Sequence, residues 1–137
     1  YYKIDCIDGW SFKKLKDKQK AWEAVLGITG GVELPTDAHG IHAAEGGFGP
    51  DQKNFLVFST TLEGATVFAE KMSGKKLAEF RPRGDRDSVH TYGEESHTQR
   101  GFPWQADTVT DNLFSKIPSS NGGILIDMKN LIVYLKR

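Results

Sequence analysis

This chain has little that could be cross-linked or inserted into a bilayer. Cys6 is the one cysteine among 137 residues, which excludes an internal disulfide and a cysteine-based zinc cluster. No apolar run approaches the roughly 20 residues of a membrane-spanning helix, and no signal-peptide pattern is visible. Lys+Arg and Asp+Glu number 18 each, so no global field draws the protein to nucleic acid or acidic lipid. We expect neither membrane insertion nor a nucleic-acid partner.

Length and glycine content together predict one loop-rich domain. A chain of 137 residues can bury a single core without disulfides or metals to hold it. The 15 glycines, many of them paired, favour an α+β domain with long loops over a helical bundle. Because Tyr1 already belongs to a strand-like pattern, we expect residues 1–137 to be a single domain cut from a longer chain or left after processing.

The most informative stretch is residues 54–71, where the hydrophobic period changes at three small hydroxyl residues. Phe55–Phe58 is a short apolar run typical of a buried strand. Apolar residues then recur every three or four positions from Leu62 to Met72, which predicts an amphipathic helix. Thr60 and Glu63 form a capping-box pattern, so we expect the helix to begin directly after the strand.

Ser59, Thr60 and Thr61 are therefore expected at a strand end and a helix N-terminus. Unpaired backbone N–H groups and the helix dipole favour an anionic or strongly accepting ligand group at such a place. Serine and threonine are also ordinary helix caps, so a purely structural role is the alternative. We predict a ligand shelf at residues 59–61.

The rest of the chain is predicted to supply strands, one more helix and irregular segments. A mixed, mostly antiparallel β-sheet core with two main helices in the N-terminal half is the fold that these patterns favour. Strands are expected over 1–6, 76–81 and 105–114, a hairpin or bent strand over 124–135, a helix over 11–26, and irregular segments over 27–53 and 88–104.

Histidines in the irregular segments are candidates for metal binding or acid–base chemistry. Asp37, His39 and His42 carry the carboxylate and imidazole groups that suit zinc or iron. No second histidine-rich element has matching spacing, so we predict no metal site. His90 and His97 lie in the later irregular segment.

Several short motifs, in this order, resemble those of the ADP-ribosyltransferase toxins of the cholera and pertussis type. Tyr2-Lys3-Ile4-Asp5 is similar to the opening Tyr-Arg-x-Asp strand of that family, and Phe58-Ser59-Thr60-Thr61 to its aromatic-Ser-Thr-Ser strand end. Residues 77–83 resemble the next strand of the family, and Ile117-Pro118 its Ile-Pro turn before a late strand. The resemblance covers most of the chain and implies the split-sheet core of that family.

The resemblance implies NAD as the substrate and assigns residues to it. The family's NAD-ordering arginine corresponds to Lys3, which keeps the charge but lacks the planar fork. Its Glu-x-Glu or Gln-x-Glu pair is matched by Gln105-Ala106-Asp107, which ends in Asp and lies a few residues further upstream. Glu95, in the pair Glu94-Glu95, is the competing carboxylate.

The implied chemistry explains why these groups would be needed. Breaking the nicotinamide–ribose bond passes through an oxocarbenium-like state, which a carboxylate near the ribose stabilises. Ser59 and Thr60 would support that carboxylate, and Thr61 would join them in the NAD site. Aromatic side chains would stack on nicotinamide, the candidates being Phe68, Tyr92 and Trp104. The ADP-ribose would pass to a macromolecular target or to water. By resemblance, the protein would be a secreted or delivered toxin or effector, with a target protein or an immunity protein as partner.

Two other classes of protein remain open at this point. A ribonuclease toxin would use His39, His42, His90 and His97 for acid–base work, but leaves residues 59–61 without a role. A non-enzymatic binding or immunity-type module would use the irregular loops as a recognition surface.

Overall fold

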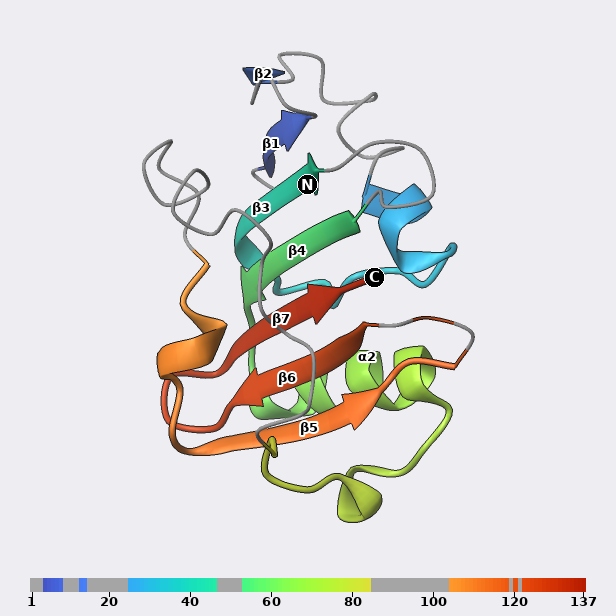
Figure 1. Ribbon diagram of the computed structural model, residues 1–137, viewed down its shortest axis with the longest axis vertical. Coiled ribbons are helices and arrows are strands. Elements are labelled where there is room, and N and C mark those ends of the chain that lie inside the picture. The colour runs from blue at the N-terminus through green and yellow to red at the C-terminus, as the bar shows by residue number, and fades with distance from the viewer. Residues whose placement is uncertain are drawn as a thin grey trace.

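A computed structural model describes residues 4–8, 13–14, 25–46, 53–84, 104–118, 120 and 122–137. These residues form a seven-stranded sheet in the order β2-β1-β3-β4-β7-β6-β5 (Figure 1). The strands are β1 (Ile4–Asp8), β2 (Lys13–Lys14), β3 (His39–Gly46), β4 (Lys53–Ser59), β5 (Asn112–Lys116), β6 (Gly123–Asp127) and β7 (Ile132–Lys136). One α-helix, α2 (Leu62–Ser73), and two 3₁₀ helices, η2 (Leu77–Glu79) and η3 (Ala106–Thr108), complete the labelled elements.

Neighbouring strands run antiparallel except at one position. The five strands β3, β4, β7, β6 and β5 are antiparallel in succession, whereas β1 runs parallel to β3. The predicted small α+β fold with a mostly antiparallel sheet is therefore confirmed. The described strands lie in one sheet, and the ADP-ribosyltransferase-type split core stays a prediction.

The junction between β4 and α2 follows the predicted change of period. β4 ends at Ser59 and α2 begins at Leu62. The N-cap is Thr61, whose hydroxyl accepts a hydrogen bond from the N–H of Gly64, so the cap lies one residue later than the capping-box pattern predicted. Gly74 ends the helix in the left-handed conformation, at φ 71°.

Two predictions for the first third of the chain are corrected. The helix expected over 11–26 is wrong at its start, because Lys13–Lys14 form a strand that pairs with β1; the described helical residues are 25–29. The segment 27–53 is not irregular throughout, because it contains β3. Local pattern misses this strand because Gly40 has φ 59° and the register shifts between His39 and His42.

Two later strands also differ from expectation. Residues 76–81, together with the similar strand expected over 77–83, contain η2 instead, and only Arg81 joins the sheet through a bridge to Phe114. The strand expected over 105–114 is η3 followed by β5. The hairpin expected over 124–135 is confirmed as β6 and β7.

The sheet separates two apolar clusters. On one face, α2 packs on alternate residues of the central strands, and the rings of Phe58 and Phe68 meet edge to face at 5.1 Å. On the other face, Trp104 packs against Phe55 and Tyr134, with ring centroids 5.2 Å apart in both pairs. Trp104 and Phe68 are thus core residues, since they are 2% and 1% exposed. Among the described residues, no helix is long and apolar enough to cross a membrane.

Candidate functional site

The predicted ligand shelf at the start of α2 holds a carboxylate of the protein itself. The Thr60 hydroxyl donates to Asp37 Oδ1 at 2.6 Å, and the Thr61 N–H donates to Asp37 Oδ2 at 3.2 Å. Asp37 therefore supplies the negative charge that a helix N-terminus attracts. Thr60 is 6% exposed, so its hydroxyl is committed to this internal contact.

The contact with Asp37 is close and changes the pKa of its carboxyl group. The hydrogen bonds from Thr60 and then Thr61 lower the pKa of the Asp37 carboxyl from its ordinary value of 3.8, because they favour the ionised form. Gly64 makes the approach feasible, since a Cβ there would overlap Thr60 Oγ1 and lie 2.9 Å from Pro35 Cβ. The start of α2 is thus built around Asp37.

Ser59 belongs to the other face of the sheet. It pairs with Ile132, which in turn pairs with Asp127, and directly paired residues in a ladder share a face. Alternation along β4 also separates Ser59 from Phe58 and places it on the face of Val57. Val57 belongs to the apolar cluster around Trp104, hereafter the Trp104 cluster, whose buried members are Phe55, Val57, Trp104, Ala106, Phe114, Leu125 and Tyr134. Of the three predicted shelf residues, Ser59 alone lies on the face that carries the pocket described next.

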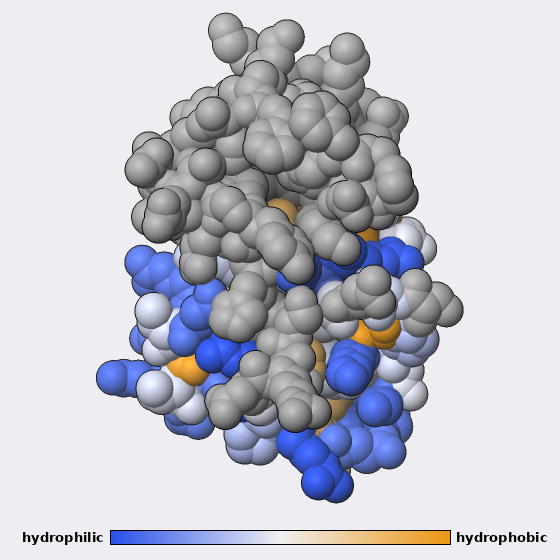
Figure 2. Space-filling view, viewed as in Figure 1, coloured by the Kyte–Doolittle hydropathy of each residue, from blue (hydrophilic) through white to orange (hydrophobic). Residues whose placement is uncertain are grey.

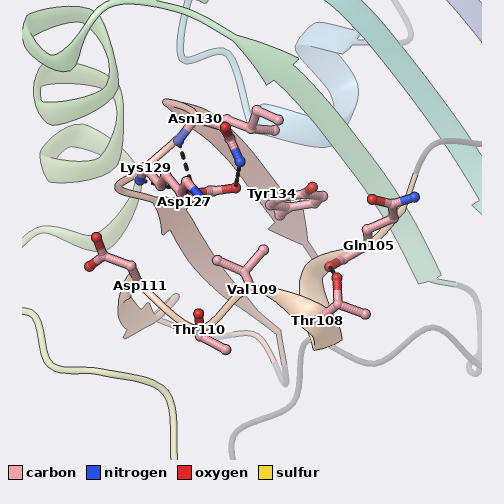
Figure 3. Close-up of a pocket in the computed structure, with 10 residues that line it drawn as sticks. Gln105, Thr108, Val109, Thr110, Asp111, Asp127, Lys129, Asn130 and Tyr134 are labelled. Carbon is pink, nitrogen blue, oxygen red and sulfur yellow. Dashed lines mark hydrogen bonds between the residues drawn. The ribbon is translucent and has the colours of Figure 1, made fainter.

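A pocket of about 250 Å³ lies on this face, between the segment 105–111 and the β6–β7 hairpin. Figure 3 shows Asp127 and Asn130 on one side of it, Gln105 and Thr108 on the other, and Tyr134 between them. The lining residues are Gln105, Thr108, Val109, Thr110, Asp111, Asp127, Lys129, Asn130, Ile132 and Tyr134. Most of them are polar, so the pocket suits a polar ligand.

Asp127 is held firmly at the inner end of the hairpin turn. Its Oδ1 accepts hydrogen bonds from the N–H groups of Lys129 and Asn130, both at 3.0 Å, and its Oδ2 accepts from Asn130 Nδ2 at 3.0 Å. The residue is 5% exposed. A structural role in the turn explains these bonds, which hold both carboxylate oxygens against the turn, at the edge of the pocket that Asp127 lines (Figure 3).

Charge in the pocket is predominantly negative. Burial, followed by the charge of Asp127, raises the pKa of the Tyr134 phenol above its ordinary value of 10.0, so this hydroxyl stays protonated and can donate. Asp111 adds a second carboxylate at the exposed side, and Lys129 is the cation among the lining residues. Such a site favours positive charge in a ligand or in a transition state.

Gln105 and Asp107, predicted as a pair, face different surroundings. Gln105 lines the pocket, whereas the Asp107 carboxylate is ion-paired with Arg83 at 3.1 Å and is not among the lining residues. Arg83 also donates to the carbonyl oxygens of Ala106 and Asp107, both at 3.2 Å. The structure brings Gln105 together with Asp111 and Asp127, and places Asp107 on the side of Arg83.

The other predicted site residues are divided between described and undescribed parts of the chain. Lys3, Tyr92 and Glu95 lie outside the described residues, as do His90 and His97. His39 is exposed and its Nδ1 lies 3.1 Å from the Asp37 carbonyl oxygen, while His42 is half-buried on β3. Within the described ranges, no cluster of three or more His, Cys, Asp or Glu residues could hold a metal ion.

Sequence reasoning missed the residues that dominate the pocket, which are Asp111, Asp127, Lys129 and Tyr134. The signal for Asp127 was an acidic residue at the end of an apolar strand, followed by Lys129-Asn130, a pattern that is typical of a turn. Nothing in this pattern distinguishes a turn that faces a pocket from one that faces solvent.

On the same face of the molecule, the described surface is mostly hydrophilic, with small separate hydrophobic spots (Figure 2).

Comparison with known proteins does not add a relative. No protein-family model matches the chain, and neither the curated proteins nor the solved structures contain a significant match.

Proposed function

We propose that this chain cleaves the nicotinamide–ribose bond of NAD, with the pocket between residues 105–111 and the β6–β7 hairpin as its site. The observation that carries the proposal is the meeting of Gln105 with two carboxylates, Asp111 and Asp127, in one pocket. Ser59, at the strand end that resembles the toxin family, pairs with Ile132, and Ile132 pairs with Asp127 on the next strand, so Ser59 and Asp127 lie on the same face of the sheet. An ADP-ribosyltransferase-like fold is part of this proposal.

The negative pocket suits the charge that develops during the reaction. As the glycosidic bond breaks, its electron pair goes to nicotinamide and positive charge grows on the ribose, where a fixed carboxylate stabilises it. Asp127 fits this role because three hydrogen bonds hold it in place before the substrate arrives. Lys129 is available for a phosphate, and Gln105 and Tyr134 can donate hydrogen bonds to hydroxyl or carbonyl groups.

The acceptor of ADP-ribose completes the reaction. With water, the products are nicotinamide, ADP-ribose and one proton; with a target protein, a nucleophilic side chain replaces the water. A role as a secreted or delivered toxin or effector rests on the motif resemblance alone and is part of the same proposal.

The test is nicotinamide release from NAD by the purified chain. We expect Asp127→Asn to lower the rate by about 10²-fold, because one charge-stabilising group is lost. Asparagine keeps an oxygen that accepts the two backbone N–H groups, so the hairpin should survive, as the thermal unfolding midpoint will show. Glu63→Gln, the same change of carboxylate to amide at an exposed position of α2, should leave the rate unchanged.

Two results would count against the proposal. One is the absence of both nicotinamide release and a thermal shift with NAD; the other is full activity of a folded Asp127→Asn protein. RNA cleavage that is lost in His39→Ala would favour the ribonuclease class instead.

A further inference from the structure

The segment 105–111 forms one wall of the pocket and is held by a network outside it. The Arg83 guanidinium reaches three oxygens of η3, namely Ala106 O at 3.2 Å, Asp107 O at 3.2 Å and Asp107 Oδ1 at 3.1 Å. Such a fork satisfies several acceptors in a single fixed geometry, which a lysine cannot reproduce.

Asn112 ties the same wall to the same residue. Its Oδ1 accepts the Arg83 N–H at 2.8 Å, and its Nδ2 donates to Val109 O at 3.0 Å. Val109 is therefore held directly, through its own carbonyl oxygen, and Gln105 is held through its neighbour Ala106, whose carbonyl oxygen accepts from Arg83. Both Gln105 and Val109 line the pocket. The wall is also held by the burial of Trp104 and Ala106, by the short internal bonds of η3, and by a hydrogen bond from the Met128 N–H to the Asp111 carbonyl oxygen at 2.8 Å.

We infer that Asp107 is a positioning residue, which acts through Arg83 to fix Gln105 and Val109 in the pocket wall, and is not the carboxylate that meets the ribose. The inference rests on the proposed function for its kinetic part. Its structural part is independent, because it concerns only how the wall is held.

The side chains of Asp107 and Arg83 are 20% and 17% exposed, so their ion pair is partly shielded from solvent. A partly buried, multiply hydrogen-bonded pair orders a segment more effectively than an exposed one. Loss of either partner should therefore loosen η3 locally without unfolding the sheet, since the Trp104 cluster remains.

The experiment compares Asp107→Asn, Arg83→Lys and the double variant, with Glu63→Gln as the matched control. Hydrogen exchange is measured at the N–H groups of Thr108 and Val109, which bond within η3, and at the buried Ile126 and Val133 of the hairpin. We expect roughly tenfold faster exchange at Thr108 and Val109 in both single variants, a non-additive effect in the double variant, and no change at Ile126 and Val133. Unchanged exchange at Thr108 and Val109 would overturn the inference.

The kinetic part uses nicotinamide release by the same proteins. A positioning role predicts a raised KM, a kcat within a fewfold of wild type and an unchanged pH profile in Asp107→Asn, with a similar result in Arg83→Lys. A kcat that falls 100-fold or more in Asp107→Asn but not in Arg83→Lys would make Asp107 catalytic and end the inference. If the wild-type chain releases no nicotinamide, the proposed function fails, and the exchange measurement alone decides the role of Asp107.

Discussion

The two faces of the sheet show how one strand end can serve opposite purposes. On the α2 face, the end of β4 is closed, because Asp37 takes up the hydrogen bonds of Thr60 and Thr61 and apolar side chains fill the space beneath. On the opposite face, the same end leads through Ser59 and Ile132 to Asp127, whose carboxylate faces a pocket. The comparison teaches that a helix N-terminus with hydroxyl residues is a ligand site only if the chain itself leaves it vacant.

The largest expected effect comes from breaking the packing of the α2 face. Phe68→Ala removes a ring that is 1% exposed and packed edge to face on Phe58, and should lower the free energy of unfolding by about 3–5 kcal/mol. Urea denaturation with an unchanged m-value would measure this loss. A loss below about 1 kcal/mol would mean that α2 is not essential to the core.

A smaller loss is expected where Asp37 and Thr60 approach α2. In Gly64→Ala the new methyl group overlaps Thr60 Oγ1, and overpacking costs about 1–3 kcal/mol, which outweighs a helix-propensity gain of about 1 kcal/mol. Thr66→Ala, at a half-buried position of the same helix whose hydroxyl donates to the Leu62 carbonyl oxygen, serves as the control and should be neutral or slightly stabilising. Equal stability of the two variants would show that the junction is loosely packed.

The dependence of stability on acidic pH tests the Asp37 contact that closes the α2 face. Because its folded-state pKa is lowered, the carboxylate stabilises the protein fully above the ordinary value of 3.8, and this contribution is lost as the pH falls through the lower folded value. The thermal unfolding midpoint of Asp37→Asn should therefore lie below that of wild type at pH 7, and the gap should close below about pH 3.8. A gap that persists unchanged at the most acidic pH would contradict the link to Asp37 ionisation.

The smallest effect is expected on the pocket side, in the β6–β7 turn. Leu131 has φ 54°, a left-handed conformation that asparagine adopts more easily than leucine. Leu131→Asn should raise the free energy of unfolding by about 0.5 kcal/mol without changing the Asp127 hydrogen bonds. Chemical denaturation would measure the gain, and a clear destabilisation would show that packing of Leu131 matters more than its backbone strain.

The sequence alone predicted the elements whose evidence is local. The change of period at Ser59–Thr61 located β4 and α2, and the apolar runs around Lys129-Asn130 located the terminal hairpin. It failed at β3, where a left-handed Gly40 and a register shift hide the strand, and at residues 76–81, where a strand-like pattern forms η2. Of the two predicted catalytic candidates in the described part of the chain, Gln105 lines the pocket and Asp107 does not.

Local periodicity and capping chemistry were thus determined by neighbouring residues, which is why the sequence by itself specified a strand, a helix and a hairpin in the correct places. Only the tertiary structure decided which groups meet. Asp37 reaches Thr60 across 23 positions, and Arg83 reaches Asp107 across 24. Contacts at such separations depend on how the sheet brings distant segments together, and no pattern of adjacent residues records that arrangement.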